Sequence, residues 1–113
     1  MIERYDFGRI VIDGKTYTSD VVMNRDKIDS NWWRKEGHEL HVEDIKTVLD
    51  RDRPEVLIIG TGFFGRMMVL PETKDFARLK GIELMVEPTP RAVETYNELY
   101  QKRKVTAALH LTC

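Results

Sequence analysis

The residues Gly60-Thr61-Gly62-Phe63-Phe64-Gly65 follow the apolar run Val56–Ile59 and match the pattern G-x-G-x-x-G. After a strand, this pattern is typical of a dinucleotide-binding turn, whose glycines let the backbone approach a pyrophosphate at a helix N-terminus. Here Pro71 follows Gly65 too soon for that helix to form. The pattern therefore favours a tight turn after a buried strand, which glycine permits by adopting positive φ.

A small-ligand site remains the alternative for this segment. Loops after Ile59 and Val86 would lie at the carboxyl ends of neighbouring parallel strands, where α/β proteins bind ligands. Glu87, at the end of the second strand, is placed where a ribose-binding acid would be expected. The residues that would surround an anion or nucleotide are Gly60, Gly62, Gly65, Arg66 and Thr89.

Other residues with possible chemistry form no complete constellation. His38 and His41 are spaced i, i+3, whereas zincin helices need i, i+4 and a third ligand. Cys113 and His110 would point to opposite faces of a strand, and no third group orients the base. We predict no catalytic residue, metal or cofactor, and the sequence favours a protein that is not an enzyme without excluding one.

Several large side chains favour an interaction surface. The pair Trp33-Arg34 has the composition of an interface anchor, although burial of both Trp32 and Trp33 under a polar loop is the alternative. The apolar loop that contains Phe63, Phe64 and Met67 either folds back onto the sheet or presents a patch to a partner. We predict the interaction residues Trp33, Arg34, Phe63, Phe64 and Met67.

The secondary structure that must position these residues changes in type along the chain. The first third predicts β structure, with the two-residue turn Asp13-Gly14 joining two strands. The remainder alternates helical and strand patterns. Predicted strands are Phe7–Ile12, Lys15–Thr18, Val21–Met23, Trp32–Trp33, Val56–Ile59, Ile82–Val86 and Val105–Leu111, and predicted helices are Glu43–Asp50, Glu72–Lys80 and one that begins at Thr89 as N-cap with Pro90 at N1.

This order predicts an α/β fold with a mixed central sheet, in which an N-terminal β-hairpin supplies antiparallel pairing and helical crossovers supply parallel pairing. The 113 residues predict a single domain over 1–113. The net charge of −1 argues against a sequence-independent nucleic-acid binder. We find no apolar run of membrane-spanning length and no targeting signal, and expect a cytoplasmic protein. The single cysteine excludes an internal disulfide and agrees with a reducing compartment.

Two segments, Thr89–Tyr100 and Val105–Leu109, resemble a known family of small proteins, as do Trp33-Arg34, Gly37-His38 and Leu57–Gly62. The family includes mitochondrial complex I assembly factor 3 and the adipogenesis-associated Mth-domain-containing protein, and its prototype is a hypothetical protein of a methanogen. The resemblance covers nearly the whole chain.

The resemblance implies a single three-layer α/β domain with a mixed sheet, and it supplies no catalytic residue to carry over. Some eukaryotic members act in respiratory-complex assembly or cell differentiation, but this sequence lacks the targeting extension that a mitochondrial role would need. The resemblance also places Asn97 where its side chain would form a hydrogen bond with a neighbouring turn. We predict a non-catalytic interaction or assembly module, which acts on a protein partner or by self-association; the alternative is a small-ligand binding protein or enzyme that uses the Gly60–Arg66 loop.

Overall fold

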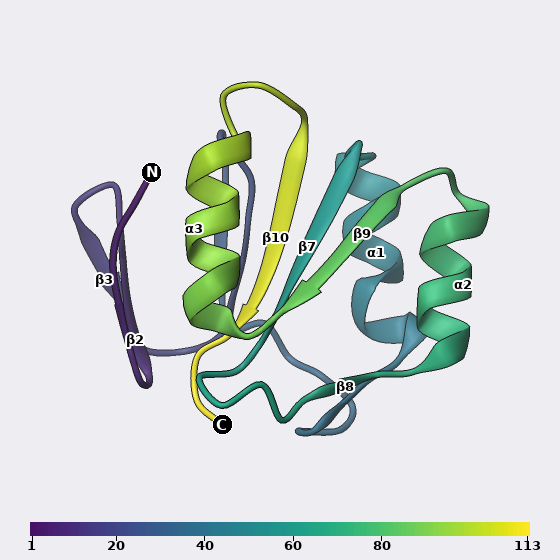
Figure 1. Cartoon of the computed structure of the whole chain (residues 1–113), viewed down its shortest axis with the longest axis horizontal. Helices are drawn as coiled ribbons and strands as arrows, with labels where there is room; N and C mark the ends of the chain where they lie inside the picture. The colour runs from purple at the N-terminus through teal and green to yellow at the C-terminus, as the bar shows by residue number, and fades with distance from the viewer.

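The computed structural model describes all of residues 1–113 (Figure 1). Its strands are β1 (Ile2–Asp6), β2 (Arg9–Ile12), β3 (Lys15–Tyr17), β4 (Val21–Met23), β5 (Ile28–Ser30), β6 (Glu39–Leu40), β7 (Val56–Thr61), β8 (Met68–Val69), β9 (Glu83–Glu87) and β10 (Val105–His110). Its helices are α1 (Val42–Asp52), α2 (Pro71–Leu79) and α3 (Thr89–Leu99). None of the helices is long and apolar enough to cross a membrane.

A mixed five-stranded sheet forms the centre of the molecule, in the order β5-β4-β10-β7-β9. Strand β7 is parallel to both β10 and β9, whereas β4 is antiparallel to β10 and β5 to β4. Strands β1, β2 and β3 form a separate antiparallel sheet, and β6 pairs with β8. The predicted α/β fold with a mixed sheet and an N-terminal hairpin is confirmed.

Layers cover both faces of this sheet, which explains why β7 is apolar along its whole length. Val56 and Ile58 belong to the core shared with α3 and the hairpin sheet. Leu57 and Ile59 belong to the core on the opposite face, which includes apolar residues of α1. Successive strand residues point to opposite faces, so one strand serves both cores. Each such side chain contributes about 1.5–3 kcal/mol through burial.

Beyond the shared core, the amide side chain of Asn97 links the hairpin sheet to α3 by two hydrogen bonds. Asn97 Oδ1 accepts a hydrogen bond from the Ile2 backbone amide at 2.9 Å, and Asn97 Nδ2 donates to the Ile2 carbonyl at 2.8 Å. Tyr5 donates its hydroxyl proton to the Leu111 carbonyl at 2.7 Å. These contacts hold β1 against elements that follow it by some ninety residues or more.

Several element boundaries differ from the prediction. Trp32-Trp33 is not a strand; the edge strand lies earlier, at Ile28–Ser30, where no strand was predicted. A turn at Gly8, whose φ is 75°, divides the predicted Phe7–Ile12 strand from an additional strand β1. Pro88, not Thr89, is the N-cap of α3. A threonine hydroxyl favours an N-cap only when tertiary partners do not compete for it, and here they do.

Candidate functional site

A concentration of polar and aromatic side chains lies at the carboxyl edge of the parallel strands. Strands β7 and β10 end side by side at Thr61 and His110, and β9 ends at Glu87 beside Gly60. The segments that follow these strands meet here, as the fold class predicts for a ligand site. The chain's C-terminal residues also reach this edge (Figure 1).

In the glycine-rich loop after β7, the amides of Gly62, Phe63 and Gly65 donate to acceptors within the protein. Gly62 donates to Thr89 Oγ1 at 2.8 Å, and Phe63 donates to the Thr112 carbonyl at 2.7 Å. Gly65 donates to the Gly62 carbonyl at 3.1 Å. A phosphate cradle needs such amides directed at the ligand. The hydrogen bonds of this loop therefore give no support to the anion-site alternative.

Steric contacts explain why glycine is required at positions 60 and 62. A Cβ atom on Gly62 would lie 2.6 Å from the Cys113 carbonyl oxygen, and Gly62 also has a φ of 105°. A Cβ on Gly60 would lie 2.8 Å from both Leu109 Cδ2 and Thr89 Oγ1. The glycines allow a close approach of the protein's own C-terminal segment and α3 to the loop.

Thr89 joins three elements at this edge. Its hydroxyl donates to the His110 carbonyl at 2.6 Å while it accepts the Gly62 amide proton. Its own amide donates to the Gly62 carbonyl at 2.9 Å. Pro90 has no amide proton, and Arg91 donates to the Pro88 carbonyl. The first turn of α3 is thus engaged within the fold, and its positive dipole end faces the protein's own carbonyls.

Exposed aromatic rings gather beside this loop; we call Phe7, Phe63, Phe64 and Arg66 the aromatic patch. The Phe63 and Phe64 centroids are 5.1 Å apart, and Phe7 lies 6.0 Å from Phe63 and 6.1 Å from Phe64. Phe7 is 52% exposed, Phe63 39% and Phe64 61%. The Arg66 guanidinium lies 5.6 Å from the Phe64 ring centroid and forms no ion pair.

Two of the predicted interaction residues lie elsewhere. Met67 is only 3% exposed and packs into the core on the α1 side. Arg34 is directed inward, with 6% of its side chain exposed. Trp33 is 78% exposed, whereas Trp32 is half-buried and donates its indole proton to the Asp44 carbonyl at 3.2 Å. The two tryptophans do differ in exposure, but they lie in an irregular loop and not in a strand, so the alternation of a strand is not the cause.

Arg34 belongs to a largely buried polar cluster with Asp20 and His110. Arg34 Nη1 lies 2.6 Å from Asp20 Oδ2, and His110 Nδ1 lies 2.8 Å from the same oxygen. Asp20 Oδ1 accepts the Leu111 amide proton at 2.8 Å. His110 lies 76 residues after Arg34 and 90 after Asp20, so no spacing pattern could have revealed the cluster. The cluster fastens the loop after β5 to the end of β10.

Electrostatics favour the charged form of Asp20 in this cluster. Burial acts to raise the pKa of Asp20, but hydrogen bonds from His110, the Leu111 amide and Arg34 outweigh it, and the pKa lies below its ordinary value. Arg34 Nε and His110 Nε2 are buried and have no hydrogen-bond partner. A carboxylate-bonded histidine with a free Nε2 is the arrangement of a base or metal ligand. None of the three side chains lines a cavity, and their contacts with one another and with the Leu111 amide make the cluster a structural anchor.

The remaining histidines and the cysteine do not assemble into a metal site. Cys113 Sγ lies 3.8 Å from His38 Nε2 at the surface, not beside His110. His41 is the N-cap of α1, and its amide donates to Asp44 Oδ2 at 2.8 Å. No group of three or more histidine, cysteine, aspartate or glutamate side chains is placed to hold a metal ion.

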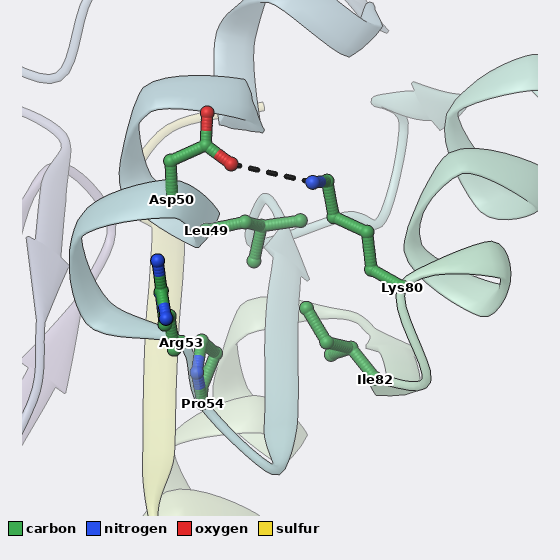
Figure 2. Close-up of a pocket in the computed structure, with 6 residues that line it drawn as sticks. All are labelled: Leu49, Asp50, Arg53, Pro54, Lys80 and Ile82. Atoms are coloured by element: carbon green, nitrogen blue, oxygen red, sulfur yellow. Dashed lines mark hydrogen bonds and ion pairs between the residues drawn. The ribbon is translucent and has the colours of Figure 1, made fainter.

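A cavity of about 320 Å³ lies at the other end of the molecule, where α1 and α2 end (Figure 2). Lys80 Nζ lies 3.3 Å from Asp50 Oδ1 across it. Arg53 caps α1 with a φ of 45°. Cations at helix C-termini offset the negative ends of the helix dipoles, so Arg53 and Lys80 are accounted for without a ligand.

Comparison with known proteins places this arrangement in a family. The family model described as a protein of unknown function (DUF498/DUF598) matches residues 2–110. The chain belongs to this family. The description assigns no activity, and the family resemblance inferred from the residues is confirmed.

Solved structures share the fold over almost the whole chain. A conserved hypothetical protein from Pyrococcus horikoshii OT3 is 31% identical with a TM-score of 0.84, covering 100% of this chain and 99% of that one. A protein named MT938 is 29% identical with a TM-score of 0.81, covering 100% and 98%. A Mth938-like domain protein from Bordetella pertussis is 18% identical with a TM-score of 0.80, covering 98% and 85%, a likeness that shows the fold alone.

Proposed function

We propose that this protein is a non-catalytic protein-interaction module, and that the aromatic patch is its docking surface. The observation that carries the proposal is the cluster of Phe7, Phe63 and Phe64, whose rings contact one another while each residue stays exposed. Aromatic residues and arginine are enriched at the centres of protein interfaces. An exposed apolar cluster costs solubility, so a covering partner would account for it.

The chemistry of the patch suggests the kind of partner. Arg66 has no acidic partner within the chain and lies against the Phe64 ring. A foreign protein segment with apolar side chains and one carboxylate would cover the rings and pair with this guanidinium. The anion-site alternative lacks comparable support, because the amides of Gly62, Phe63 and Gly65 already have acceptors.

The experiment is site-specific photo-cross-linking. The protein carries a benzoylphenylalanine at position 64, and a control carries it at Leu79, which is 88% exposed on α2. A cross-linked protein seen only from position 64 is identified, purified and titrated against the wild type, Phe64→Ser and Arg66→Glu. Each substitution is expected to weaken binding at least about tenfold, or about 1.4 kcal/mol.

Two results would contradict the proposal. Equal cross-linking from positions 64 and 79 would show no preference for the patch. Unchanged affinity in both variants would show that neither the ring nor the guanidinium contributes. A homodimer in sedimentation that disappears in Phe64→Ser would replace the foreign partner with a second copy.

A further inference from the structure

Strand β9 is an open edge of the central sheet. Its five residues, Glu83–Glu87, pair only with β7, and no strand lies on its other side. Figure 1 shows β9 as the outermost strand of the sheet, next to α2. The strand at the opposite edge, β5, has only three residues. Proteins usually shorten or cover an edge strand, because its free backbone groups can pair with another chain.

The pairing with β7 decides which backbone groups are free. Glu83 donates its amide to the Glu55 carbonyl at 3.0 Å, so its backbone groups point toward β7. In a parallel pair, alternate residues point to alternate sides. The amides and carbonyls of Leu84 and Val86 therefore point away from the sheet, whereas those of Met85 point toward β7.

A groove of about 390 Å³ runs between this edge and α2. Its lining residues are Lys74, Arg78, Ile82, Glu83, Leu84 and Val86. Val86 is 40% exposed, although it lies in a strand of the central sheet. The groove thus combines free backbone groups, a strip of branched apolar side chains and a helical wall. These features are what strand addition by an extended peptide requires.

Charge sets the preferred occupant. The helical wall carries Lys74, which forms no ion pair, and Arg78, whose pair with Asp75 at 3.0 Å is solvent-exposed and worth little. An acidic side chain on the incoming strand would face both cations. A second copy is disfavoured, because antiparallel pairing along the whole strand would place Glu83 directly opposite Glu87.

We propose that β9 accepts an extended acidic–apolar segment of another protein as a sixth strand. Branched apolar side chains of that segment would contact Leu84 and Val86, and a carboxylate would face Lys74 and Arg78. This surface is separate in its residues from the aromatic patch, so either proposal can fail without the other.

The test is selection from a random nine-residue peptide library against the full chain, with counter-selection against Val86→Pro. Proline removes the outward amide of residue 86 and leaves the bonds to β7 in place. Val86→Thr, which keeps a branched side chain and the amide, is the matched control. Enriched peptides are expected to carry branched apolar residues at alternate positions and a net negative charge.

One enriched peptide is then synthesised and its effect on amide hydrogen exchange is measured. We expect the Leu84 and Val86 amides to slow at least about tenfold when the peptide binds, while the Met85 amide, already bonded to β7, changes little. The double variant Lys74→Glu/Arg78→Glu is expected to weaken binding about tenfold or more, whereas Lys46→Glu, on α1, leaves it unchanged. These charge variants decide the question if Val86→Pro fails to fold.

Three results would overturn the inference. The first is a library that yields no peptide with a preference for the wild type over both Val86→Pro and the double charge variant. The second is a bound peptide that leaves amide exchange at Leu84 and Val86 unaltered. The third is enrichment of basic peptides in place of acidic ones.

Discussion

At the residue scale, the glycines after β7 illustrate how one pattern can serve different physical needs. A dinucleotide-binding turn uses glycine so that a phosphate can approach the backbone. In this protein the approaching group is the C-terminal segment, whose Cys113 carbonyl occupies the space a Gly62 Cβ would need. The same residue type at the same spacing therefore serves internal packing.

Gly62→Ala tests this assignment. The substitution combines a φ of 105° with contacts under 3.0 Å to backbone atoms, so it should lower the free energy of unfolding by about 2–4 kcal/mol. Gly14→Ala is the control, because Gly14 has a φ of 83° but no atom within 4 Å of the added Cβ. It should cost only about 1 kcal/mol. Equal losses in chemical denaturation would contradict the packing explanation.

At the element scale, α3 is held to the sheet by its first residue. Thr89 accepts a proton from the loop after β7 and donates one to the end of β10. The hydroxyl that was predicted to cap the helix instead binds the Gly62 amide and the His110 carbonyl, because both of these buried groups need hydrogen-bond partners. Pro88 begins the helix without a side-chain cap.

Thr89→Val should expose the value of this connection. Valine keeps the shape but leaves the Gly62 amide and the His110 carbonyl without their partner, which should lower the free energy of unfolding by about 2–3 kcal/mol. Thr89→Ser keeps the hydroxyl and should recover most of that loss. Urea denaturation of both variants measures the difference, and a serine variant no more stable than the valine variant would contradict the assigned hydrogen bonds.

At the scale of the whole molecule, the largely buried cluster of Asp20, Arg34 and His110 joins the end of β10 to two segments from the first third of the chain. It fastens the residue before β4, the loop after β5 and the end of β10 at the edge where the aromatic patch also lies. Because the carboxylate pairs with a guanidinium at low exposure, removing it would leave Arg34 as an uncompensated buried charge.

Stability should therefore depend on pH through Asp20. Its folded pKa lies below the ordinary value, so its contribution is fully present above the ordinary pKa of about 3.9 and is lost as the pH falls through the lower folded pKa. At pH 7, Asp20→Asn should lower the free energy of unfolding by about 3 kcal/mol. The difference from the wild type should shrink below pH 3.

Asp6→Asn is the matched control, because Asp6 pairs with Arg4 at an exposed position. Its loss should stay within about 1 kcal/mol. A difference between wild type and Asp20→Asn that stays constant from pH 7 to pH 2 would show that the carboxylate charge is not what stabilises the cluster.

Much of the fold was predictable because its signals are local. Asp13-Gly14 forms the predicted hairpin turn, and Val56–Ile59 forms the predicted strand buried on both faces. The misplaced elements have weaker signals. Ile28–Ser30 becomes a strand because the polar turn after β4 folds it back onto β4, where Met23 lies opposite Ile28. Trp32 is held outside the sheet by the Asp44 carbonyl, which accepts its indole proton.

The candidate surfaces were predictable only in part. Phe63 and Phe64 were expected in an apolar loop, but Phe7 joins them from the turn after β1. Met67 and Arg34 point inward although their neighbours Met68 and Trp33 are exposed. An irregular loop has no repeating backbone geometry, so the sequence does not indicate which of two adjacent side chains is buried and which is exposed.

Hydrophobic periodicity and turn chemistry along the chain account for the α/β class, the order of the main elements and the lack of a complete catalytic motif, since these follow from interactions between near neighbours. Only the three-dimensional arrangement decides which polar groups are bonded internally and which strand edge stays open. Those properties arise from contacts such as Asp20 with His110 or Gly62 with Thr89. The partners lie far apart in the sequence, and no local pattern indicates that they meet.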